Sequence, residues 1–66
     1  MMKIDCFKVH LLLAEKNLRQ LDLAEKSNIS IATINNVLNG KNASYRTIYN
    51  LSKALDVPVR DIVAME

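Results

Sequence analysis

The stretch from residue 31 to residue 39 places uncharged polar side chains on one side of a predicted helix. At about 100° per residue, its large aliphatic side chains share one face: Ile34, Val37 and Leu38. The opposite face carries small and amide side chains, namely Ala32, Asn35, Asn36 and Asn39. Amides pair with adenine edges and methyl groups pack on thymine methyls, so this face has the chemistry for a major groove. A helix face that is polar only by chance could carry the same residue types, so these residues alone do not distinguish the two interpretations.

No catalytic or metal-binding pattern accompanies this face. Cys6 and His10 lie four residues apart and share a helical face, but two ligands do not complete a metal site. Gly40 is the only glycine, so a glycine-rich phosphate loop is excluded, and the single histidine has no visible nucleophile to activate. We therefore expect no enzymatic activity, no cofactor and no metal.

The charge distribution is compatible with a polyanionic partner. The formal net charge is only +2, yet no acidic residue lies between Glu25 and Asp56. That interval holds asparagines and four cations, Lys26, Lys41, Arg46 and Lys53. Such a block is usually only a solvated face, but it also suits nucleic acid, and composition alone leaves both interpretations open.

Length and composition indicate one small domain over residues 1–66. Half of the chain is hydrophobic, while Gly and Pro occur once each, so disordered and collagen-like classes are excluded. The longest apolar run, residues 11–14, is far too short to span a bilayer. The single Cys6 cannot close an internal disulfide. We expect a soluble cytoplasmic protein with no membrane segment.

Helical periodicity dominates the chain and predicts the all-α class. We expect five helices, over about residues 6–16, 20–27, 31–39, 45–55 and 58–64. Asp5, Ser30 and Ser44 are suitable N-caps, and Asn17, Asn28 and Gly40 suit the turns that follow helices. The fourth helix has a predicted core stripe of Tyr45, Ile48, Leu51, Ser52 and Leu55, with Tyr49 beside it, and the fifth contributes Ile62 and Val63.

Several of these segments, at these spacings, resemble the helix-turn-helix of the phage repressor/Cro family, also called the XRE family. They are residues 18–24, which read LRQLDLA, residues 29–37, which read ISIATINNV, and the following Asn39, Gly40 and Lys41. Residues 44–57 resemble the fourth helix of the family, so the resemblance covers nearly the whole chain. It implies a lambda-repressor-like fold in which the second and third helices form the motif and the third enters the major groove of double-stranded DNA.

The resemblance also implies roles for individual residues. Base edges would be contacted by Ile31, Ala32, Thr33 and Asn36. Phosphates would be contacted by Gln20, Asn39, Lys41 and Arg46. The helical wheel independently exposes Ala32, Asn36 and Asn39, whereas Ile31 and Thr33 rest more on the resemblance.

Departures from the family pattern occur in the first three helices. Leu13 and Leu38 stand where the family often has an Arg–Glu pair, and exchanging such a pair for a packed apolar pair is commonly neutral or stabilising. Arg19 stands where the family often has a capping Ser or Thr. It leaves the second helix weakly capped but adds a charge that can reach a phosphate.

The first helix is apolar nearly all round. Phe7, Leu11 and Ala14 share one side, and Val9 and Leu13 are among the apolar residues of the other. Either both sides pack within the domain, or part of the helix is an exposed patch for a partner protein or a second copy.

The sequence thus predicts a small bacterial or phage transcriptional regulator, most simply a repressor. We expect it to bind a near-palindromic operator as a homodimer through the fifth-helix region, residues 58–65. The alternative is an antitoxin or adaptor that holds a partner protein through the first or fifth helix, with DNA binding secondary or absent.

Overall fold

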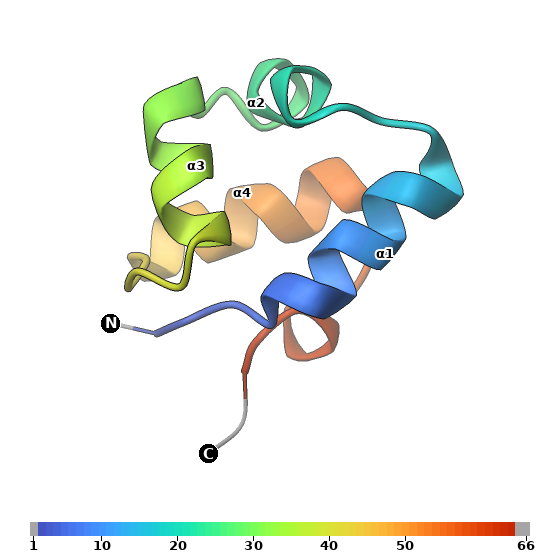
Figure 1. Ribbon diagram of the computed structural model, residues 1–66. Coiled ribbons are helices and arrows are strands. Elements are labelled where there is room, and N and C mark those ends of the chain that lie inside the picture. Colours follow the sequence, from blue (N-terminus) through green and yellow to red (C-terminus); the bar gives the residue numbers. More distant parts are fainter. Residues whose placement is uncertain (1, 65–66) are drawn as a thin grey trace.

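The computed structural model describes residues 2–64, which form four α-helices and one 3₁₀ turn (Figure 1). The helices are α1 (Cys6–Lys16), α2 (Gln20–Ser27), α3 (Ile31–Leu38) and α4 (Tyr45–Leu55), and the turn is η1 (Val59–Asp61). α2 packs against both α3 and α4, while α1 contacts α3. The all-α class is confirmed, and the helix-turn-helix order is that of the predicted motif.

The N-cap residues start the helices as their side chains predict. The Asp5 carboxylate accepts a hydrogen bond from the Lys8 backbone N–H at 3.1 Å. Ser30 and Ser44 cap α3 and α4 by accepting from the backbone N–H groups three residues later, at 3.2 Å each. These bonds satisfy N–H groups that have no partner inside the helix.

Residues in the left-handed backbone conformation follow three of the α-helices. Asn17 and Asn28 follow α1 and α2 with φ of 55° and 59°, as expected, and Asp56 follows α4 with φ of 57°. Gly40 lies just beyond α3 at φ 92°, a conformation that glycine adopts without a Cβ penalty. The turn between α2 and α3 therefore depends on Asn28.

The expected fifth helix over 58–64 is wrong: only the 3₁₀ turn η1 forms. Its backbone does not continue as a helix because the following residues pair with the N-terminal segment. Val63 forms an isolated antiparallel bridge with Ile4, and the Ile62 carbonyl accepts from the Asp5 N–H at 2.7 Å. A bridge this short leaves no alternating pattern for sequence reasoning to detect.

The core forms where the helices meet. Its inward-facing positions match the predictions for α3 (Ile34, Val37 and Leu38), for α4 (Ile48, Leu51, Ser52 and Leu55) and for Ile62, while Val63 is half-buried. Leu13 is buried in the same cluster as Leu38, which accords with an apolar replacement for the Arg–Glu pair.

Two tyrosines of α4 were wrongly assigned to the core side. Tyr45 is 72% exposed and Tyr49 is 54% exposed. Tyr45 is the first residue of α4, and the inward stripe begins only at Ile48. A helical wheel gives direction around the axis but not where along the axis the neighbouring helices end.

The structure decides between the alternatives for α1. Val9 and Leu13 are buried, whereas Phe7 is 73% exposed and Leu11 is 45% exposed. One side of α1 therefore packs on the core and the other is an exposed apolar patch. The interpretation that both sides are packed is wrong.

We predict that Asn28→Ala lowers the free energy of unfolding by about 1 kcal/mol, because Ala tolerates the left-handed conformation poorly. Asn28→Gly should match or exceed the wild type. Urea unfolding monitored by circular dichroism measures both, with Asn42→Ala as a control on an exposed asparagine outside the left-handed region. A loss in the Gly variant as large as that in the Ala variant would contradict this role.

Candidate nucleic-acid interface

Burial of one side of α3 determines which residues the opposite side presents. Because Ile34, Val37 and Leu38 point into the core, the side chains of Ala32, Asn35 and Asn36 are exposed, and Ile31 is 40% exposed. Among residues 2–64, no side-chain hydrogen bond engages either amide, so both are available to an external partner.

Thr33 is the least available of the predicted base-contacting residues. It is half-buried, and its hydroxyl accepts a hydrogen bond from the Ser30 hydroxyl at 3.0 Å. Only its methyl group and its remaining hydrogen-bonding capacity are available to an external partner. Ile31, Ala32 and Asn36 are thus all exposed, whereas Thr33 is half-buried and less available.

Three of the predicted phosphate-contacting residues follow α3 in the chain, two in the loop after it and one at the start of α4, while Gln20 lies in α2. The backbone N–H of Lys41 donates to the Asn36 carbonyl at 3.1 Å, which folds the loop back onto the end of α3. Asn39, Lys41 and Arg46 are all exposed. Figure 1 shows α3, this loop and the start of α4 along the same side of the molecule.

This surface has cations without matching acids. In the part of the chain that the structure describes, the one ion pair joins Arg19 and Asp22, so Lys41 and Arg46 have no carboxylate partner there. No acidic residue occurs in α3, the loop or α4. Unpaired cations beside neutral amides give the surface a positive potential suited to a polyanion.

The start of α2 is capped in a way that the sequence analysis missed. Asp22 accepts from the Arg19 backbone N–H at 2.9 Å and from the guanidinium Nε and Nη2 at 3.1 and 3.0 Å. The expectation of a weak cap is therefore wrong, since a carboxylate three residues on serves the orphan N–H. The Arg19 guanidinium is exposed but held against its own helix.

These hydrogen bonds shift the pKa values of Arg19 and Asp22. The side-chain hydrogen bond from Arg19 is the largest cause that lowers the pKa of Asp22, followed by the backbone hydrogen bond from the same residue. The reciprocal hydrogen bond, with the attraction of the carboxylate, raises the pKa of Arg19. Gln20, the first residue of α2, is half-buried beside them.

Tyr45 is a candidate that sequence reasoning missed, because the wheel assigned it to the core. With Arg46, Tyr49 and Asn50 it lines a shallow groove of about 380 Å³ on the outer side of α4. Tyr45 is exposed and directly precedes Arg46 at the start of the helix, and its hydroxyl is a hydrogen-bond donor. Tyr45 is identified as a candidate only by its exposure in the structure together with the neighbouring Arg46.

Cys6 and His10 do not form a site within residues 2–64. The half-buried Cys6 thiol lies 3.5 Å from the Val37 carbonyl oxygen and donates to it. No group of three or more potential ligand side chains in this range is placed to hold a metal ion. Likewise, no helix over these residues combines the length and apolarity needed to cross a bilayer.

Comparison with known proteins places the same region in a known family. The model of a family described as Helix-turn-helix matches residues 9–62, which include most of α1 and everything from α2 to η1. Searches of curated proteins and of solved structures gave no match. The match supports the family resemblance on which the base-contacting and phosphate-contacting roles were predicted.

We predict that Asp22 stabilises the fold only while it is ionised. Because its folded pKa lies below its usual value of 3.8, its contribution is fully present above that pH and is lost as the pH falls through the folded pKa. In urea unfolding from neutral pH downward, the stability gap between wild type and Asp22→Ala should narrow in strong acid. A gap of constant size at every pH would contradict the ion-pair cap.

Proposed function

This chain belongs to the XRE-type helix-turn-helix family of DNA-binding regulators, and we propose that it is a transcriptional repressor whose α3 contacts base edges in the major groove of its operator. The observation that carries the proposal is the exposed, uncharged face of α3, with free amides, flanked by unpaired cations. A helix has the right width to enter a major groove. Occupation of a promoter by such a domain would block transcription.

The proposed contacts divide into two classes. Asn36 forms a bidentate pair with adenine, while Ile31, Ala32 and the Thr33 methyl group pack on thymine methyls, so we expect an operator that contains A·T pairs. Gln20, Asn39, Lys41 and Arg46 contact phosphates and orient the protein without selecting sequence.

Arg19 is a conditional phosphate contact. Two of the five N–H donors of its guanidinium are engaged by Asp22, and the side chain is exposed, so the remaining donors are available. It therefore binds a phosphate while keeping its pair with Asp22, and contributes less than the unpaired Lys41 and Arg46.

The functional unit that we propose is a homodimer on a near-palindromic operator. A single small module buries about 600–1,000 Å² on DNA, less than most specific complexes require. Of the 58–65 region that the sequence analysis favoured, residue 65 lies outside the described residues, while Pro58, Val59 and Arg60 are exposed. An exposed valine beside a proline is suited to a small symmetric contact.

A second candidate function follows from the apolar patch on α1. Exposure of Phe7 and Leu11 favours an antitoxin or adaptor that uses this patch to hold a partner protein. Gel-shift titration against random DNA, followed by selection of bound sequences, separates the two. A selected motif with steep salt dependence supports the repressor, and absence of binding even at low salt supports the adaptor.

We predict opposite signatures for Asn36→Ala and Arg46→Gln. The first should cost about 1–3 kcal/mol at one operator position and flatten the preference there, because an adenine pair is lost. The second should weaken operator and random DNA equally and lower the salt slope by about one, because a phosphate contact is lost. Selection and salt titration with each variant provide the measurement, and an unchanged motif with Asn36→Ala would refute its role.

We predict two protomers per operator, with half-site centres about 34–36 Å apart. Val59→Glu should abolish cooperative pairing on DNA but keep half-site preference, since it places a charge in the proposed contact. Phe7→Glu is the matched control on the competing surface. Sedimentation of the complexes measures stoichiometry, and one protomer bound with high specificity to a single half-site would contradict the dimer. If Phe7→Glu abolishes cooperative pairing and Val59→Glu does not, the dimer contact lies on α1.

A further inference from the structure

The N-terminal segment before α1 is built into the domain between two distant parts of the chain. Met2 forms an antiparallel bridge with Ala43: its N–H donates to the Ala43 carbonyl at 3.1 Å, and the Ala43 N–H donates back at 2.6 Å. On the other side, Ile4 bridges Val63 and the Lys3 carbonyl accepts from the Ala64 N–H at 3.0 Å. The backbone of residues 2–4 is therefore held in a defined position.

This pairing determines the exposure of the side chains. Successive side chains along an extended segment point to opposite sides. Ile4 is buried at 3% exposure and Met2 is half-buried, so Lys3 between them is directed outward, and it is exposed.

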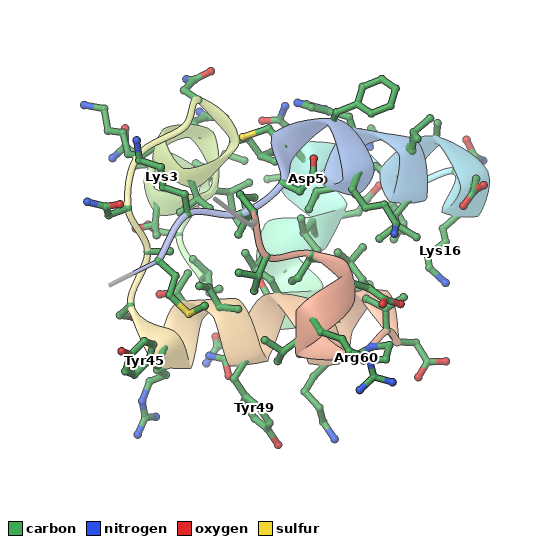
Figure 2. All side chains as sticks on the ribbon, turned by 90° about the horizontal axis from the view of Figure 1, so that it is seen from below. Lys3, Asp5, Lys16, Tyr45, Tyr49 and Arg60 are labelled. Carbon is green, nitrogen blue, oxygen red and sulfur yellow. The ribbon has the colours of Figure 1, made fainter. Side chains whose placement is uncertain are left out.

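The bridge places Lys3 beside the loop that carries Lys41. Ala43, the partner of Met2, lies two residues after Lys41 and directly before the Ser44 cap of α4. In Figure 2, Lys3 and Tyr45 lie at the same end of the molecule, whereas Lys16 lies at the opposite end. Lys3 thus lies beside the loop that carries Lys41, and Arg46 follows that loop at the start of α4.

No acidic side chain among residues 2–64 neutralises Lys3 by an ion pair. The nearest acid in the sequence, Asp5, uses its carboxylate to cap α1 through the Lys8 N–H. Lys3 therefore keeps its charge available to an external anion, and the backbone bridges hold its Cα at little further entropic cost on binding.

We propose that Lys3 contacts a DNA phosphate next to those bound by Lys41 and Arg46, so that the N-terminal segment is part of the DNA-binding surface. This proposal rests on the proposed function. The contact is independent of sequence, and it links the integrity of the Met2–Ala43 bridge to DNA affinity. The charge distribution along the sequence did not indicate this contact, because Lys3 lies outside the acid-free interval between Glu25 and Asp56.

The test is a salt titration of binding to random-sequence duplex DNA with Lys3→Gln. Loss of one phosphate contact should make the negative slope of log K against log salt shallower by about 0.9 and weaken binding most at low salt. Lys3→Arg should keep the wild-type slope, because it preserves the charge. Thermal unfolding of each variant should match the wild type, since no side-chain hydrogen bond of Lys3 is lost.

Lys16→Gln is the matched control, because it removes the same charge from an exposed lysine at the opposite end of the molecule. Its slope should stay at the wild-type value, so that net charge alone does not explain the effect. If Lys3→Gln and Lys16→Gln give the same slope while Arg46→Gln lowers it, the Lys3 contact is refuted and the proposed function stands. If the wild type shows no salt-dependent binding at all, the proposed function itself fails.

Discussion

Burial of the aliphatic face of α3 is the constraint on which the rest of the site depends. With Ile34 and Val37 at 1% and 2% exposure, the helix cannot rotate without moving apolar side chains from the core into water. That burial fixes the outward direction of Asn36 and its neighbours. Packing therefore determines which side of α3 the proposed interface uses, because the core sets the direction of its polar side chains.

The cations around α3 come from elements that other interactions hold. The loop with Lys41 is fastened at one end by the bond from its N–H to the Asn36 carbonyl, and at the other by the Ala43–Met2 bridge and the Ser44 cap. Rigid placement of phosphate-binding groups orients a protein on DNA, and amide contacts in the groove then select the sequence. The apolar patch on α1 takes no part in this arrangement.

Most of the helices and the inward positions of α3 were predictable because they depend on local rules. Helical period and capping chemistry act over three or four residues, which is the range that a single sequence shows directly. Two failures involve longer range: η1 is short because Val63 pairs with Ile4, and Tyr45 is exposed because the core ends before it. The cap of α2 is a local failure, because Asp22 lies only three residues after Arg19 and its carboxylate accepts from the Arg19 N–H. The position of Lys3 beside the loop that carries Lys41 likewise could not be predicted, because it depends on the bridge between Met2 and Ala43.

The most direct test of the central claim is an NMR titration of ¹⁵N-labelled protein with a short random-sequence DNA duplex at low salt. The largest amide shift changes should fall on α3, on the loop of residues 39–44 and at the start of α4, because these form one surface. Shift changes concentrated on α1 around Phe7 and Leu11, with α3 unaffected, would contradict the account.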